Sequence, residues 1–466
     1  MSFIRDGMYK SPSAPAYFLL FGLIFLFFYI DLLGLPWKRF YTISFFLLLS
    51  LWAIVVIIER CRHVRHVWNR IDSFFVLFLI SILISIAINW WDGSLKYLEM
   101  MPFLFLLPYC LGRVMIVSDF FFLRKISVLM GIFVLILLTL SVENFIQTFY
   151  LGESITQLIY EKSFFASLPH GYMLINLLLA TTLISLASFV LSPSIKYKST
   201  PIFLERFYFF AGYVFLFLVF LIMMIIPSRA GVVSGMIGVI FLAVYSMSNI
   251  SKKIITLVII FACILMCTYL IPWSNYLHSR YADLIVPPTF FDVTRGESFL
   301  VTSDRIFSSN KDIIQGHVNH LILGNDACMT IINSVTDRWV YFQQAIAIFI
   351  SRPLGVGANH YGFYSCQGPG AFPHSTLLQV FTELGIIVGF GYCVLIWLTL
   401  STLIRAVRMS WNVHEAHILM WFFTFALMQV LIAQLIGNYF ISSSLYFAVG
   451  VAASSQNHNI FVRESC

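Results

Sequence analysis

The sequence predicts an all-α polytopic membrane protein with about twelve transmembrane helices and one large outer loop between the ninth and the tenth. Three observations favour this fold class. Of the 466 residues, 60% are hydrophobic and only 11% are Asp, Glu, Lys or Arg, whereas a soluble domain carries about 25% charged residues. Apolar runs of roughly 20 residues, enough to cross a bilayer, recur along the chain. One stretch, residues 273–373, contains no such run.

The apolar runs are interpreted as spanning helices. An unpaired backbone group in lipid costs several kcal/mol, and the alternating pattern of a β-barrel strand is absent. The first run is expected to be a retained span, because it is too long for a signal peptide and lacks a small-residue cleavage site. The twelve runs lie near 16–36, 41–58, 73–89, 100–118, 126–142, 170–192, 207–226, 231–250, 254–272, 374–400, 413–432 and 434–454.

Basic residues predict the orientation. With the N-terminus inside, seventeen of the 28 Lys and Arg residues fall in inner segments, and Lys38 and Arg39 are a mild exception on the outside. This excess follows the positive-inside rule, so both termini are expected in the cytoplasm. The chain then divides into spans one to nine (1–272), an outer loop (273–373), spans ten to twelve (374–454) and a cytoplasmic tail (455–466).

The charge pattern and the motifs exclude other classes. The net charge of +7 is spread in short clusters, so no nucleic-acid partner is expected. No Gly-rich phosphate loop or long inner segment could form a cytoplasmic nucleotide site. Cysteine spacings match no zinc site. Cys328 and Cys366 share the outer loop, where they could form a disulfide or remain free thiols.

Candidate functional residues lie on the outer side. Arg229, preceded by Ser228, is either a snorkelling anchor or an anion ligand. Arg338 opens an amphipathic stretch that ends in a turn containing Gly355 and Gly357. The guanidinium and the backbone N–H groups of that turn could cradle phosphate, or the stretch could be an interfacial helix with a surface Arg.

The mouth of the tenth span carries a further candidate site. His374 could act as a general base, or it could be a polar cap where Ser375 and Thr376 begin the helix. Glu383 follows within the span and is interpreted either as a functional group or as a structural partner for a neighbouring helix. Asp31, near the outer end of the first span, has the same two interpretations.

Together these residues resemble the signature of the O-antigen ligase and O-antigen polymerase family. The match consists of Arg338, the run Pro353-Leu354-Gly355-Val356-Gly357, and His374-Ser375 followed after nine residues by Gly385, with Ser228-Arg229-Ala230-Gly231 ahead of them. The detailed resemblance covers roughly residues 225–400. Val388 and Phe342 depart from the family pattern.

The resemblance implies an inverting, metal-independent glycosyltransferase of the bacterial inner membrane that needs no cofactor. Such an enzyme transfers a glycan from undecaprenyl diphosphate to lipid A-core at the periplasmic face, among membrane lipids. Arg229 and Arg338 would bind the diphosphate, and His374 would orient or deprotonate the acceptor hydroxyl. Weaker contacts to the diphosphate or the glycan are expected from Ser228, Arg352, Gly355, Gly357 and Ser375.

Other functions remain open at this point. A polymerase of the same family would join repeat units on undecaprenyl diphosphate, and a pilin-type protein glycosyltransferase is a more distant relative. A transporter of an anionic substrate should show interrupted helices in two corresponding halves and several charges at mid-membrane. The sequence shows no such internal repeat.

Overall fold

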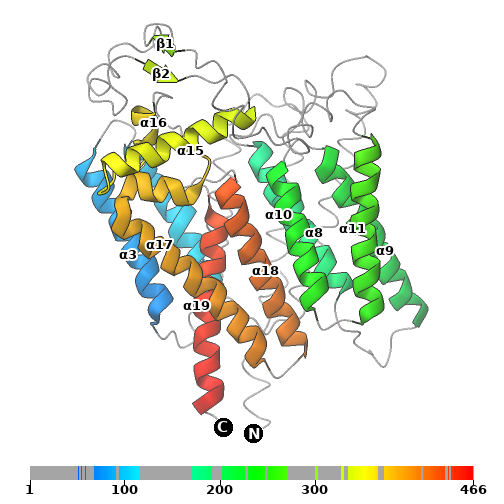
Figure 1. The fold of residues 1–466 in the computed structure, drawn as a ribbon. Helices are drawn as coiled ribbons and strands as arrows, with labels where there is room; N and C mark the ends of the chain where they lie inside the picture. Colours follow the sequence, from blue (N-terminus) through cyan, green and yellow to red (C-terminus); the bar gives the residue numbers. More distant parts are fainter. Residues whose placement is uncertain are drawn as a thin grey trace.

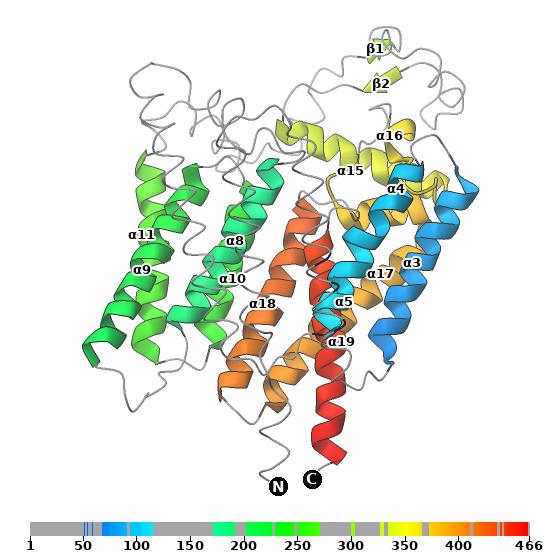
Figure 2. The same cartoon turned by 180° about the vertical axis from the view of Figure 1, so that it is seen from behind.

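The described part of the chain folds into a bundle of helices, with a further helix and two short strands over one end (Figures 1 and 2). The structure is a computed structural model. It describes residues 68–90, 94–114, 171–191, 202–225, 229–246, 249–270, 300–302, 327–329, 334–365, 372–410, 413–435 and 442–464, together with the separate positions Leu51, Ile54, Ile58 and Tyr439.

Nine of the predicted runs coincide with helices in the described part of the chain. The runs near 16–36 and 126–142 lie outside the described residues, and of the run near 41–58 only three helical positions are described. The helices of the bundle are α3 (Arg70–Ile88), α4 (Ser94–Met101), η1 (Pro102–Leu106), α5 (Leu107–Val114), α8 (Gly171–Val190), α9 (Ile202–Ile225), α10 (Arg229–Tyr245), α11 (Ile250–Leu270), α17 (Thr376–Met409), α18 (Val413–Leu435) and α19 (Ser443–Glu464).

Several helices have the composition of membrane spans. Among the described residues, three helices are long and apolar enough to cross a membrane: Arg70–Ile88, Thr376–Met409 and Ala416–Leu435. α3 is apolar on both sides, with Phe75 and Ile82 buried and Ile84 and Ile88 exposed. A helix that is hydrophobic all round is expected where its outer face meets lipid. These helices support the prediction of a helical membrane protein.

The fourth predicted run forms three short helices rather than one. It begins at Ser94, earlier than expected, and passes through the π-helical turn η1 before α5. Pro102 and Pro108 have no N–H to donate to a preceding carbonyl, which disfavours regular α-helical hydrogen bonding here. The amide of Leu107 donates instead to the carbonyl of Pro102, five residues back.

The tenth and twelfth spans also differ from their predicted bounds. α17 continues to Met409, and α19 begins at Ser443 and runs to Glu464, so residues 455–464 are helical where a tail was expected. A helix continues as long as its backbone hydrogen bonds do, and it needs no apolar side chains beyond the membrane. Hydropathy therefore marks the apolar part of each helix, not its ends.

The segment between α11 and α17 lies over one end of the bundle. Its described parts are a two-stranded antiparallel sheet of β1 (Leu300–Thr302) and β2 (Ala327–Met329), the helix α15 (Ser334–Ser351) and the single turn α16 (Tyr361–Tyr364). α15 lies across the ends of the bundle helices, with the sheet beyond it (Figures 1 and 2). This arrangement fits the expected outer loop and confirms a helix over the amphipathic stretch.

Helix α5 packs closely against α19. A Cβ atom on Gly112 of α5 would lie 2.1 Å from the carbonyl oxygen of Phe447, and one on Gly450 of α19 would lie 2.1 Å from that of Tyr109. Glycine at both positions lets the two backbones approach, as is common between membrane helices. α17 packs against α3, α18 and α19 and is central to this half of the bundle.

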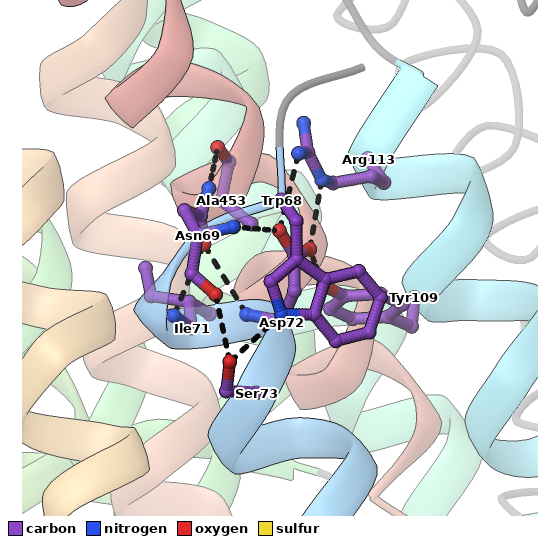
Figure 3. A network of polar contacts seen from close by, with 8 residues as sticks. All are labelled: Trp68, Asn69, Ile71, Asp72, Ser73, Tyr109, Arg113 and Ala453. Atoms are coloured by element: carbon purple, nitrogen blue, oxygen red, sulfur yellow. Dashed lines mark hydrogen bonds and ion pairs between the residues drawn. The ribbon is translucent and has the colours of Figure 1, made fainter.

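A buried polar network joins the start of α3 to α5 (Figure 3). Arg113 Nε lies 2.9 Å from Asp72 Oδ1 and Nη2 lies 3.2 Å from Oδ2, while the phenol of Tyr109 donates to the same carboxylate. Asn69 caps α3 and donates to the carbonyl of Ala453 in α19. Arg113 is one of the seventeen basic residues that the predicted orientation assigns to inner segments, and it is 9% exposed and pairs with Asp72.

Candidate functional site

The candidate site is built around a break in α17. At Gly385 the backbone leaves the helical region, with φ 84° and ψ 177°. The segment 353–357 lies against this break and is joined to it by three backbone hydrogen bonds. Val356 N–H donates to Thr382 O (3.0 Å), Gly357 N–H donates to Glu383 O (2.9 Å), and Ile386 N–H donates to Pro353 O (2.8 Å). The two halves of the sequence motif thus meet directly.

The glycines of the motif allow this close approach. A Cβ atom on Gly355 would lie 2.5 Å from the carbonyl oxygen of Glu383, and one on Gly385 would lie 2.5 Å from the carbonyl of Leu354. A Cβ atom on Gly357 would lie 2.7 Å from the side chain of Asn89, the C-cap of α3, and all three glycines have positive φ. The glycines of the motif are therefore needed for the close packing of the segment 353–357 against α17 and α3.

The same hydrogen bonds bear on the expected phosphate cradle. The amide of Gly355 donates to Arg352 O, and the amide of Gly357 donates to Glu383 O. In this arrangement neither N–H group is available to an anion. We therefore assign Gly355 and Gly357 to the packing of the turn against α17 and do not retain them as diphosphate ligands.

Glu383 lies at the centre of the contact and is 1% exposed. Its Oε2 accepts hydrogen bonds from Asn359 N–H (2.7 Å) and the phenol of Tyr439 (2.7 Å). Its Oε1 accepts from Gln379 Nε2 (3.2 Å) and Tyr361 N–H (3.4 Å). These contacts fit the interpretation of Glu383 as a structural partner, although its donors outside α17 belong to the segments 359–361 and 439 rather than to a neighbouring spanning helix.

His374 precedes the first turn of α17 in a left-handed conformation, with φ 54°. Few residues other than glycine adopt such a backbone, and those that do are enriched at functional sites. The half-buried ring stacks on Tyr341 of α15 at 5.4 Å between centroids and contacts Phe372 at 4.7 Å. The imidazole is thus held between α15 and the start of α17.

The residues after His374 begin the helix. Ser375 is the N-cap: its Oγ accepts from Leu378 N–H (3.4 Å) and donates to Gln434 Oε1 (3.0 Å). Thr376 Oγ1 donates instead to the carbonyl of Ala433 in α18. The capping interpretation is therefore confirmed for Ser375, and both hydroxyls tie the mouth of α17 to the end of α18.

Helix α15 carries both Arg338 and the Tyr341 that stacks on His374. Residues three apart on a helix are neighbours, about 5–6 Å between Cβ atoms, so Arg338 lies one turn from the Tyr341 that stacks on His374. The phenol of Tyr361 donates to Tyr341 O (3.0 Å) and fixes this part of α15. Burial raises the pKa of that phenol, which keeps its proton available for the bond.

Arg229 begins α10 at the same end of the bundle as His374. Gly235 of α10 faces Ala180 of α8, and Gly238, one turn later, faces Ile184, so the two helices run in the same direction. The last turns of α8 contact the first turns of α18, which follows closely on the end of α17. The starts of α8, α10 and α17 therefore share one end.

The remaining predicted residues fall into two groups. Arg352 is exposed just beyond α15, where its guanidinium donates to the phenol of Tyr364 (3.2 Å) and lies 4.9 Å from the centre of that ring. Ser228, Cys366 and Asp31 lie outside the described residues, as do the side chains of Arg229, Arg338 and Cys328. The disulfide therefore stays a prediction.

Three residues of the site were not predicted from the sequence. Tyr439, between α18 and α19, and Asn359, at φ 60°, both bind Glu383. Ser85 of α3 accepts from Ala358 N–H at 2.8 Å. Glu383 within an apolar run was the only signal, because a buried carboxylate requires donors somewhere, but the run does not say which.

Comparison with models of known protein families finds none that matches this chain, and comparison with characterised proteins finds no match either. The family resemblance accordingly depends on the motif residues alone.

Proposed function

We propose that the chain is a membrane glycosyltransferase that moves a glycan from undecaprenyl diphosphate to lipid A-core at the periplasmic face. One observation supports this most. Segments of the motif that are far apart in sequence meet at one place, since 353–357 lies in the break of α17 and His374 stacks on the helix that carries Arg338. A motif with this compact arrangement is suited to a single reaction centre.

In the proposed reaction, the acceptor hydroxyl oxygen attacks the anomeric carbon of the donor sugar. The new C–O bond forms as the bond from that carbon to the diphosphate oxygen breaks, with inversion. His374 receives the hydroxyl proton, and the diphosphate leaves as an anion. Arg229 and Arg338 stabilise its developing charge, a role for which the bidentate guanidinium is well suited.

Transfer by the purified protein in detergent tests this proposal. The reaction contains an undecaprenyl-diphosphate-linked glycan, lipid A-core and EDTA. His374→Gln keeps polarity but loses the base, so we expect transfer to fall about 10²- to 10⁴-fold. Arg229→Lys keeps charge but loses the bidentate contact, and a loss of about 10²- to 10³-fold is expected. Arg405→Lys, an exposed change in the last turns of α17, is the matched control.

Each outcome distinguishes one function. Glycan on lipid A-core, lost in His374→Gln, supports the ligase. Longer chains that remain on undecaprenyl diphosphate would identify a polymerase instead. Full activity in His374→Gln would contradict the role of His374 as the base. Full activity in Arg229→Lys would contradict a bidentate contact between Arg229 and the diphosphate. A folded wild-type protein that transfers to neither acceptor would contradict the glycosyltransferase and favour transport.

A further inference from the structure

We infer that Glu383 is a positioning residue, which fastens the segment after α15 to α17 and so holds α15 and His374 in one arrangement. The inference deepens the proposed function and depends on it for its catalytic meaning. Glu383 itself is placed in no chemical step.

The contacts of Glu383 come from three separate parts of the chain. Gln379 lies one turn earlier on α17, Tyr439 follows α18, and the amides of Asn359 and Tyr361 belong to the segment after α15. Two of the four donors are backbone N–H groups. The carboxylate therefore fixes the path of the backbone, whichever side chains that segment carries.

From this segment the contacts continue to His374. The amide of Tyr361 binds Glu383, its phenol binds the carbonyl of Tyr341, and the ring of Tyr341 stacks on His374. His374 in turn adjoins the start of α17, the helix that carries Glu383. The contacts form a closed ring, and Arg338 lies one turn from Tyr341 within it.

The chemistry of the donors explains why a carboxylate is needed. Each oxygen of Glu383 accepts one backbone N–H and one side-chain donor. A glutamine offers one acceptor oxygen and one NH2 group. Whichever way its amide turned, the NH2 group would face the N–H of either Asn359 or Tyr361. Glu383→Gln is thus nearly isosteric, yet it removes one backbone anchor.

The matched control is a second buried phenol. Tyr439→Phe removes one of the four donors to Glu383. Tyr392 is equally buried, on α17 itself, and within the described part of the chain its hydroxyl has no hydrogen-bond partner. Tyr392→Phe therefore changes the same chemical group with no hydrogen bond to lose, and it should behave as wild type.

Two measurements on the full-length protein test the inference. The first is the distance between spin labels on Ile350→Cys and Arg408→Cys, in a background without the native cysteines. Both positions are exposed, one on α15 and one near the end of α17. The second is steady-state transfer to lipid A-core, with kcat and KM determined separately.

In Glu383→Gln we expect a broadened label distance and a kcat about 10- to 100-fold lower, because small displacements of catalytic groups cost up to about 10² in rate. KM for the lipid-linked donor should change little, and Tyr439→Phe should give a smaller effect of the same kind. If Glu383→Gln does not fold, the inference is tested by comparing Tyr439→Phe with Tyr392→Phe. The label distance and kcat are again the measured quantities, and only Tyr439→Phe should change them.

If Glu383→Gln, or Tyr439→Phe in its place, has the label distance and the kcat of the wild-type protein, the inference is overturned and the glycosyltransferase proposal stands. A broadened distance between the spin labels with an unchanged kcat would also overturn the inference, because the arrangement that Glu383 holds would then not matter for transfer. If the wild-type protein transfers to neither acceptor, the proposed function fails, and the label distances alone decide whether Glu383 holds this arrangement.

Discussion

Gly385 interrupts α17 without ending it, and this single residue makes room for the segment 353–357. Its φ of 84° with ψ of 177° lies in a region that is essentially restricted to glycine. The absence of a side chain also admits the carbonyl of Leu354. The backbone groups freed at the break bind that segment, so the interruption is compensated by contacts.

Gly385→Ala should therefore destabilise the protein, and Gly391→Ala on the same helix should not. The first change forces strain of about 1–3 kcal/mol in addition to the overlap with Leu354. The second meets open space and should stabilise by about 0.5–1 kcal/mol, as alanine does in a helix interior. Apparent melting temperatures in detergent provide the measurement, and a Gly385→Ala protein as stable as wild type would contradict this account.

At the scale of elements, α15 has two distinct faces. Ala345 and Ile348 are buried together with Val356 and Tyr361, and Thr382 of α17 donates to the carbonyl of Ala345. On the other side, Ile346 and Ile350 are exposed, four residues apart. A helix lying across the ends of spanning helices with an exposed apolar stripe fits the membrane interface.

Two isoleucines close together on α15, one buried and one exposed, allow the contribution of packing to stability to be measured. Ile348 is 3% exposed and Ile350 is 72% exposed. Ile348→Ala should cost about 2–5 kcal/mol, since it leaves a cavity in the contact with α17. Ile350→Ala removes the same atoms from an open face and should cost much less. Comparison of the two melting temperatures tests the orientation of α15, and a larger loss for Ile350→Ala would reverse it.

At the scale of the whole molecule, charge and fold agree on two distinct ends. The start of α17 and α15 lie at one end, and Arg405 and Arg408, in the last turns of α17, lie at the other (Figure 1). The predicted orientation assigns the first end to the periplasm and the second to the cytoplasm.

Cysteine labelling tests this orientation. In a background without the native cysteines, Leu354→Cys should react with an impermeant maleimide added to intact spheroplasts, because the position is 82% exposed at the end that the predicted orientation assigns to the outside. Arg408→Cys should react only after the membrane is permeabilised. The reverse pattern would invert the topology and move the candidate site to the cytoplasmic side.

The sequence by itself determined the helical class, the approximate positions of the described spans, the amphipathic α15 and the residues worth examining at its end. Hydropathy and the capping preference of Ser375 are local properties, legible within a few turns. The tertiary structure decided which groups meet. Glu383 finds donors at residues 359, 361 and 439, and Arg113 finds Asp72 on another helix. It also decided the role of the motif glycines. A buried charge obliges the chain to supply partners, but only the packing of distant segments selects them.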